Sequence, residues 1–368
     1  MNNSNVYNYT TKGSLDFVLK TFDFQKTGKI GRFDIIHNLD IVEYCTGIKP
    51  TEKNLFYLIK KTCDKLLDLT LIYPEAYTKE KKFSWNGFKY KQDWWTIWMI
   101  ERPFHDLKGL KEYILKEIDE LEDWKSGEAW DWWMKWCVED YRDYYINANK
   151  PMVNVTTIYA QSPIALDVAI NRAGVELFWY LYYEDPDLVT KWLDAYINHE
   201  IKRINDIADA KICSIAMVEC DIGYKNGLIA SPEFLKIEFF PRLKRIVDAW
   251  HKHNYKVIYH SDGYIMDVMD EIVDSGIDAL HPIDVTSGMN MIKLREQYPN
   301  LVLIGGIDSI GLLALGTPKK IEKEIVKIIN AIGQTGGIFL GSSIEIDPSS
   351  KLENIISVDE TLKKHGLR

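Results

Sequence analysis

Acidic and imidazole side chains recur directly after short apolar runs in the second half of the chain. Eight of them fall in five places: Glu219 and Asp221, His260 and Asp262, His281 and Asp284, Asp308, and Glu345. In a parallel barrel the carboxyl ends of the strands open on one face, so residues far apart in sequence converge there. The pattern therefore predicts a shared polar mouth. Taken singly, each residue also suits a turn or a helix cap.

His260 and Asp262 form the sharpest pair within this set. Extended residues two apart project to the same side, so both side chains are placed to bind one ion or to share one proton. Together with Glu219 or Asp221 and with Glu345, they would offer nitrogen and oxygen ligands to zinc or another divalent ion. In the alternative, His260 works without metal as a general acid or base beside Asp262. The sequence leaves both open.

The remaining candidates are given supporting roles. We expect Asp221 to orient His260 or to complete the ligand set, and Asp308 to position the substrate. Side chains expected to contact the substrate are Tyr159, Tyr224, His281 and Asp284. The chain contains no G-x-S-x-G elbow, no P-loop and no G-x-G-x-x-G motif, which argues against serine-hydrolase and dinucleotide chemistry.

Short apolar runs alternate with helical stretches and predict a parallel sheet. The expected strands are 33–36, 67–72, 153–159, 212–218, 256–260, 278–282, 301–306 and 337–340. Helices should begin at Asp185-Pro186, Ser231-Pro232 and Thr317-Pro318, where a capping side chain precedes a proline. Gly333 should end the third, and Pro241 should kink or divide the second. Eight strands predict an α/β fold of the (β/α)₈ TIM-barrel type, as a single domain over residues 1–368.

One segment interrupts this rhythm. Between about residues 85 and 136 the chain is acidic and crowded with tryptophan, and we expect a largely helical insertion in the N-terminal part of the barrel. Its tryptophans would form an aromatic packing layer. Alternatively, they would make a lid or wall over the substrate.

Composition excludes several classes of partner. The formal net charge is −9 and no basic run is present, which argues against nucleic acid and anionic membranes. No stretch approaches about 18 apolar residues and the first 13 residues are polar, so we expect neither a membrane span nor a signal peptide. The five cysteines show no CxxC spacing, and a reducing cytoplasm fits them best.

The order of motifs resembles the uroporphyrinogen decarboxylase superfamily, which also contains corrinoid-dependent methyltransferases. The resemblance runs from Asp221-Ile222-Gly223-Tyr224-Lys225 through Ser231-Pro232-Glu233-Phe234 to His260-Ser261-Asp262-Gly263. It continues in Gly276-Ile277-Asp278-Ala279-Leu280, Gly288-Met289, Gly305-Gly306-Ile307-Asp308, Leu315-Gly316-Thr317-Pro318 and Glu353-Asn354. It covers about residues 150–366 and, more faintly, Cys45-Thr46-Gly47. It implies the barrel fold.

Two departures bear on the reaction. The decarboxylases carry an arginine-rich N-terminal motif and a late Gly-His-Gly motif, whereas here the first hundred residues hold only Arg32, and Gly341-Ser342-Ser343-Ile344-Glu345 stands at the late position. The methyltransferases bind zinc through His-x-Cys and a later Cys, whereas here Asp262 replaces the first cysteine, and Ser342 or Ser343 lies near the second. An ion held without thiolates is harder, and suits an ether oxygen or an amine better than a thiol.

The resemblance therefore implies a methyltransferase component. It would move a methyl group from a small O-methyl or N-methyl donor, such as a methoxylated aromatic, to the cobalamin of a partner corrinoid protein. A divalent metal, zinc first, would assist. Two alternatives stay open: a metal-free decarboxylase of an organic acid, and a barrel that binds a ligand without turnover.

Overall fold

The computed structural model describes residues 12–71, 78–94, 96–125, 155–158, 160–210 and 213–367. At its centre lies a sheet of short strands in the order β6-β2-β1-β14-β13-β12-β11-β8-β7, in which all neighbours are parallel. The strands are β1 (Gly31–Asp34), β2 (Leu69–Leu71), β6 (Thr156–Ile158), β7 (Ala160–Pro163), β8 (Ile215–Glu219), β11 (Lys256–His260), β12 (Ala279–Ile283), β13 (Val302–Ile307) and β14 (Ile338–Ser342).

The two outermost strands of this order belong together. β6 and β7 are one residue apart in the sequence, yet β6 pairs with β2 and β7 pairs with β8. One interrupted strand thus joins both ends of the sheet. The nine segments make the eight-stranded (β/α)₈ barrel that the sequence predicts, and all eight expected runs contribute to it.

Burial explains why these runs form strands. β13 is buried along its whole length, as is β12; β13 contains only aliphatic residues and glycine, whereas β12 also contains His281 and Pro282. Parallel strands covered on both faces characteristically read as continuous apolar runs. The expected strand 256–260 coincides with β11, and most of the others shift by one or two residues.

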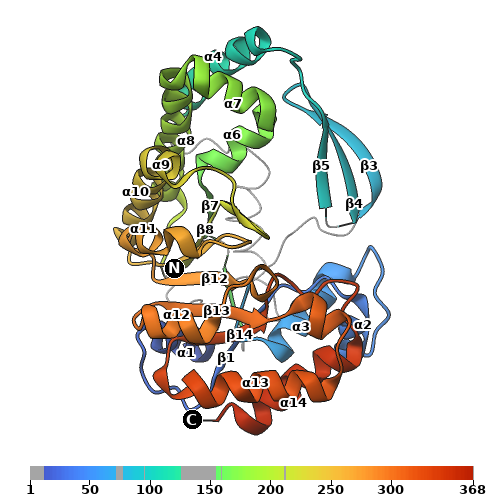
Figure 1. Cartoon of the computed structure of the whole chain (residues 1–368). Coiled ribbons are helices and arrows are strands. Elements are labelled where there is room, and N and C mark those ends of the chain that lie inside the picture. Colours follow the sequence, from blue (N-terminus) through green and yellow to red (C-terminus); the bar gives the residue numbers. More distant parts are fainter. Residues whose placement is uncertain are drawn as a thin grey trace, which may run out of the picture.

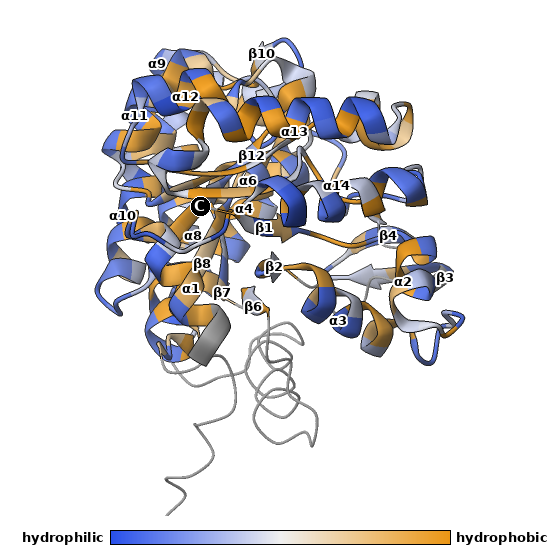
Figure 2. Cartoon of the chain, turned by 90° about the horizontal axis from the view of Figure 1, so that it is seen from below, coloured by the Kyte–Doolittle hydropathy of each residue, from blue (hydrophilic) through white to orange (hydrophobic). Residues whose placement is uncertain are grey.

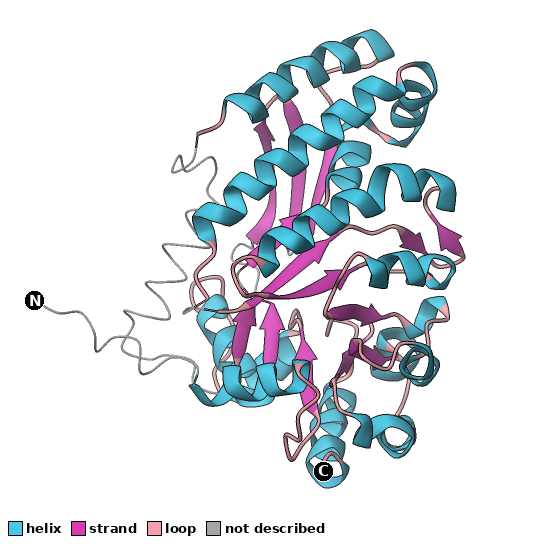
Figure 3. Ribbon diagram, turned by 90° about the vertical axis from the view of Figure 1, so that its left-hand side faces the viewer, coloured by secondary structure: helices cyan, strands magenta, loops and turns pink. Residues whose placement is uncertain are grey.

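Helices surround the strands (Figures 1 and 3). They are α1 (Lys12–Phe22), α2 (Leu39–Thr46), α3 (Leu55–Leu66), α4 (Leu107–Asp123), α6 (Ala165–Ala173), α7 (Val175–Glu184), α8 (Pro186–Ile207), α9 (Pro232–Phe234), α10 (Phe240–His251), α11 (Met269–Asp274), α12 (Met291–Gln297), α13 (Pro318–Ile332) and α14 (Leu352–His365). Apolar and polar stretches alternate along α13 (Figure 2), which buries Ile321, Ile325, Ile328 and Ile332. This three-and-four spacing presents one apolar face to the sheet.

The predicted helix starts are confirmed. Asp185 caps α8 by accepting the Leu188 N–H, and Ser231 caps α9 by accepting the Phe234 N–H. α13 begins at Pro318 and is followed by Gly333, although the Thr317 side chain makes no capping hydrogen bond. The helical stretch containing Pro241 is divided as expected, because a π-helical turn (Leu235–Phe239) separates α9 from α10. Proline has no N–H to continue a regular α-helix, which favours such an irregularity.

The expectation of a largely helical insertion is wrong for its first part. Antiparallel strands β3 (Thr78–Trp85), β4 (Phe88–Trp94) and β5 (Thr96–Glu101) form a separate sheet beside the barrel (Figure 1). Asn86 and Gly87 connect β3 to β4 with φ of 48° and 81°, the geometry of a tight hairpin turn for which Asn-Gly is the preferred sequence. α4 is helical as expected. Trp130, Trp132, Trp133 and Trp136 lie outside the described residues.

Two further expectations concern membranes and cysteines. Within the described ranges, no helix combines the length and apolar character needed to cross a bilayer. Cys45, Cys63, Cys213 and Cys220 are free thiols, in keeping with the absence of a disulfide framework, and Cys137 lies outside the described residues.

Candidate active site

Three of the predicted side chains come together at the carboxyl ends of β8 and β11. The potential ligand atoms of Asp221, His260 and Asp262 all lie within 4.8 Å of one another. Asp221 Oδ1 lies 3.7 Å from His260 Nε2 and accepts the backbone N–H of Asp262 at 2.9 Å. Asp221 thus contacts both other members.

Neighbouring residues fix the backbone around this cluster. The buried Ser261 hydroxyl accepts the Ile222 N–H at 3.1 Å, which ties the loop after β8 to the loop after β11. Gly263 has a φ of 90°, and a Cβ there would lie 2.4 Å from the Tyr224 nitrogen. Only glycine permits both the left-handed backbone and this close approach. The two loops are therefore held in one arrangement.

His281 lies behind His260. Its Nδ1 is 2.8 Å from His260 Nδ1, its side chain is completely buried, and its ring packs 4.6 Å from that of Phe33. Its Nε2 has no hydrogen-bond partner in the described part of the chain. Burial lowers the pKa of His281 well below its usual range, and His260 lowers it further, so the ring is neutral. His281 was expected to contact the substrate, which requires a side chain exposed at the barrel mouth. The buried ring contacts His260 instead.

Three carboxyl groups of this region, those of Asp262, Asp167 and Glu219, have raised pKa values. Burial raises the pKa of Asp262 to about 6, assisted by Asp221 and Asp284 and opposed by His260. Burial likewise raises the pKa of Asp167 to about 8, with Asp221 and Glu219 adding to the effect. Burial raises the pKa of Glu219 as well. Carboxyls that hold protons near neutral pH are suited to acid–base work.

Sequence reasoning missed Asp167. It lies in the first turn of α6, directly after β7. The expected strand ended at residue 159, whereas β7 runs to Pro163 and so brings α6 to the mouth. The apolar run Ile164-Ala165-Leu166 before the acid was the available signal.

Other predicted residues lie outside the three-residue cluster. Glu219 is the last residue of β8, in register with His260, but contributes no ligand atom to the group. Glu345 lies 3.4 Å from His37 Nε2, beyond the end of β1. Asp308 accepts the N–H groups of Ile310 and Gly311, as a cap.

The expected substrate contacts also separate. Asp284 is buried and accepts hydrogen bonds from the backbone and hydroxyls of Thr286 and Ser287, as well as from the Gly263 N–H. It fastens the loop after β12 to the loop after β11. Tyr224 is half exposed in β9 (Gly223–Tyr224), which pairs with β10 (Gly227–Leu228). Tyr159 lies outside the described residues.

The cluster is suited to a divalent cation. It offers one imidazole and two carboxylates, and Asp262 Oδ1 is a buried oxygen without a hydrogen-bond partner among the described residues. Three protein ligands with an open position are the usual arrangement of catalytic zinc, and oxygen-rich sets also suit harder ions.

Comparison with known proteins places the chain in a family. The model of the uroporphyrinogen decarboxylase (URO-D) family matches residues 157–365, more than half of the sequence. The chain belongs to the uroporphyrinogen decarboxylase family. The matched region includes β8, β11 and β12, and so every member of the cluster. The resemblance seen in the motifs is thereby confirmed.

Two relatives of this family member are methyltransferases. The protein "Methylcobamide:CoM methyltransferase MtbA" of Methanosarcina mazei is 22% identical over 175 residues, which are 47% of this chain and 49% of the relative. The match thus spans about half the length of that relative. A solved methyltransferase structure from Methanosarcina mazei has a TM-score of 0.63 at 14% identity, over 95% of this chain and 98% of the other. This structural likeness establishes the shared fold.

Proposed function

We propose that this protein is a methyltransferase that moves a methyl group from a small O-methyl or N-methyl donor to the cobalamin of a partner corrinoid protein. The observation that carries the proposal is the Asp221–His260–Asp262 cluster at the barrel mouth. Barrel enzymes place their chemistry at this end. The methylcobamide in the name of the relative MtbA supports the corrinoid side of the reaction.

The cluster would activate the leaving heteroatom. The bond between the methyl carbon and the donor oxygen or nitrogen breaks, the heteroatom keeps the electron pair, and the methyl group passes to the corrinoid. Asp262, whose pKa burial raises to about 6, or His260 would hold the proton that the leaving oxygen takes up. In the alternative, a zinc or similar ion held by His260, Asp221 and Asp262 would take the place of this proton and supply Lewis acidity at the heteroatom.

Surrounding residues take supporting roles in this proposal. Asp221 orients His260, and His281 contacts the other side of the His260 ring. Asp284 holds the loop of Asp262 by accepting the Gly263 N–H. Tyr224, half exposed on β9, is placed to contact the donor. Asp308 stays a proposed substrate-positioning residue, and Glu219 and Glu345 stay proposed additional metal ligands, although none of the three contributes an atom to the cluster.

An aromatic donor is supported by a cavity of about 330 Å³ beside the end of β7. Its walls include Trp85, Trp124 and Tyr196, and it reaches Pro163, whose register partner is Glu219. Flat aromatic side chains pack well on aromatic ligands. The cavity thus touches the end of β7 and has walls suited to a methoxylated ring, although no member of the Asp221–His260–Asp262 cluster lines it.

A reconstituted assay tests the function. The protein is mixed with a reduced corrinoid protein and a methoxylated aromatic, and methylation of the cobalamin is followed by its absorbance. We expect transfer by the wild type, loss of at least about a hundredfold in His260→Ala and Asp262→Ala, and full activity in Asp248→Asn, which changes an exposed carboxylate paired with Lys244 on α10. Unchanged transfer in the double His260/Asp262 variant would overturn the mechanism.

Metal-free decarboxylation of an organic acid is the second candidate. The observation favouring it is Asp167, whose pKa burial raises to about 8, so that the carboxyl is protonated at neutral pH and is able to protonate the carbanion left by CO₂. Release of CO₂ without any corrinoid, lost in Asp167→Asn, would select this function.

A further inference from the structure

Arg32 is a buried arginine, and most of its donors have no partner among the described residues. It is the second residue of β1, only 3% exposed, and the only arginine in the first hundred residues. Its Nη1 lies 3.3 Å from Asp359 Oδ1 on α14. Its Nε and Nη2 are buried and have no hydrogen-bond partner in the described part of the chain. A buried cation normally has its hydrogen bonds satisfied.

The geometry of the guanidinium makes this pair of donors informative. The Nε–H and one Nη2–H lie on the same edge of the planar group and point in parallel. This edge is the fork that takes two oxygens of one carboxylate or phosphate. Asp359 occupies another position, at Nη1, and leaves the fork free.

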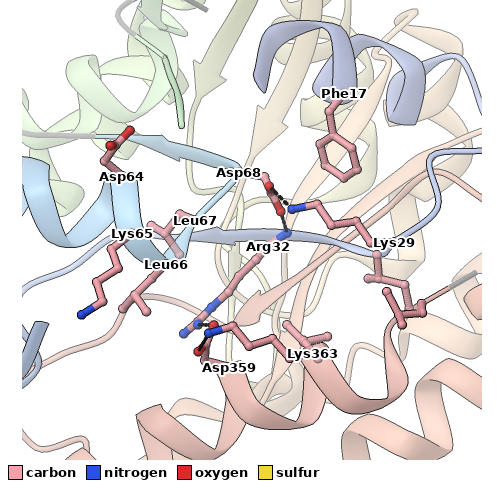
Figure 4. A pocket seen from close by; sticks show the side chains of 13 residues that line it. Phe17, Lys29, Arg32, Asp64, Lys65, Leu66, Leu67, Asp68, Asp359 and Lys363 are labelled. Atoms are coloured by element: carbon pink, nitrogen blue, oxygen red, sulfur yellow. Dashed lines mark hydrogen bonds and ion pairs between the residues drawn. The ribbon is translucent and has the colours of Figure 1, made fainter. Parts of the chain in front are cut away.

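A cavity of about 660 Å³ lies at this place, between β1, the end of α3 and α14 (Figure 4). The cations lining it are Lys29, Arg32, Lys65 and Lys363, and the carboxylates are Asp64, Asp68 and Asp359. Four cations thus face three carboxylates.

The ion pairs within the cavity show where the extra positive charge lies. Lys29 pairs with Asp68 at 2.6 Å, whereas Asp359 is shared between Arg32 and Lys363, which lies 2.6 Å from it. Figure 4 shows the Arg32 and Lys363 head groups meeting at Asp359. Among the described residues, Lys65 donates to the backbone carbonyl of Cys45. Among the charged residues that line the cavity, positive charge therefore exceeds negative charge by one.

We propose that this cavity binds a small oxyanion, a carboxylate or a phosphate, through the Nε–H and Nη2–H fork of Arg32, with Lys363 and Lys65 adding charge. The site lies at the amino-terminal end of β1, whereas the Asp221–His260–Asp262 cluster follows the carboxyl ends of β8 and β11. The proposal is independent of the methyltransferase function. It gives the single N-terminal arginine a ligand away from the barrel mouth.

Calorimetric titration of the full chain tests the site. Inorganic phosphate and acetate are titrated separately at constant ionic strength, and binding of either one at one per chain is expected and identifies the type of anion. Arg32→Lys keeps the charge but removes the fork, so affinity should fall at least about tenfold. Lys108→Ala, which removes a lysine 85% exposed on α4, is the matched control and should bind as the wild type does.

A second variant protects the test against misfolding. If Arg32→Lys fails to fold, as judged by circular dichroism, Lys363→Ala should still weaken binding several-fold, because it removes one charge beside the fork. Absence of binding of both anions to the wild type at millimolar concentration would overturn the proposal. Equal affinity of the wild type and the folded Arg32 or Lys363 variant would overturn it as well.

Discussion

The Nδ1 atoms of His260 and His281 lie 2.8 Å apart. A contact of this length holds one proton between the two ring nitrogens, so one ring donates and the other accepts. If His281 donates, His260 carries its own proton on Nε2, facing Asp221. If His260 donates, its Nε2 lone pair is free to bind a metal ion, and His281 carries a proton on its buried Nε2.

Metal binding should change which of these two tautomer arrangements His260 and His281 adopt. A buried N–H without an acceptor costs about 1–3 kcal/mol, and Nε2 of His281 has no partner among the described residues. The metal-free protein should therefore protonate His281 on Nδ1, and zinc loading should move that proton to Nε2. Nitrogen-15 NMR of the histidine rings distinguishes the two tautomers. The same His281 tautomer with and without zinc would contradict the expected exchange.

Replacing His281 should alter metal affinity. His281→Leu removes the partner of His260 Nδ1, and loss of such an outer-shell hydrogen bond typically weakens metal binding about 10–100-fold. His281→Asn places an amide oxygen near the former Nδ1 and should recover part of the affinity. Competition with a chromophoric zinc chelator measures both constants. His253→Ala, which changes a histidine bonded to Asn205 instead, serves as the control.

Metal content provides a separate test of the cluster. Protein purified without chelator should contain about one ion per chain by elemental analysis, and His260→Ala and Asp262→Ala should each lose it, because two ligands rarely retain a catalytic ion. His251→Ala, which removes a histidine paired with Asp278, should keep the wild-type content. An ion retained in both cluster variants would place the metal elsewhere.

Stability should depend on pH through Asp34. Burial raises the pKa of this carboxyl from 3.8 to about 6, against the effects of Arg32 and Ser342. Between about pH 4 and pH 6 the folded state therefore holds a proton that the unfolded state has released. Stability falls as pH rises through this window, by about 3 kcal/mol at most, and the penalty remains at higher pH.

Asp34→Asn should remove that penalty. The amide oxygen is able to keep the hydrogen bonds from the Ser342 N–H and hydroxyl, which Asp34 Oδ1 now accepts at 3.0 and 2.5 Å. The variant should melt at a higher temperature than the wild type at pH 7, and the difference should disappear near pH 4. Calorimetric scans across this range measure the effect, with Asp248→Asn as an exposed control. A lower melting temperature at pH 7 would contradict the assigned cause.

Asp284 should matter for folding more than its place near the mouth suggests. Asp284→Ala leaves several buried donors without an acceptor, including the Gly263 N–H, and should cost about 2–4 kcal/mol. Asp106→Ala removes an exposed helix cap of α4 and should cost about 1 kcal/mol. Urea denaturation compares the two. Equal losses would show that the bonds of Asp284 contribute no more than a surface cap.

Strand positions were predictable because burial on both faces leaves an apolar run that few other elements produce. The hairpin between β3 and β4 was not predicted, although Asn86-Gly87 marks its turn, because a segment rich in tryptophan and acidic residues also suits packed helices. Alternation in Phe88-Lys89-Tyr90-Lys91 was the signal that indicated a strand.

The site was predictable only in part. A residue that directly follows a strand lies at the barrel mouth. The direction of its side chain, however, depends on how the barrel closes and on whether the side chain caps a helix nearby. His260 and Asp262 share one strand end, so their proximity follows from the sequence alone. Glu345 belongs to another strand end and meets His37, and the Asp308 carboxylate turns to its own helical segment. These outcomes depend on contacts that spacing does not encode.

Gly263 has no side chain to take part in the reaction, yet its replacement should abolish activity as replacement of a catalytic residue does. Any side chain there would push the loop of Asp262 away from Tyr224, since even a methyl group would overlap the backbone. A library scored by activity would reject every replacement, as it would reject replacements of His260. A parallel score for protein abundance would separate them, because Gly263 variants lose the folded protein while His260 variants lose only turnover.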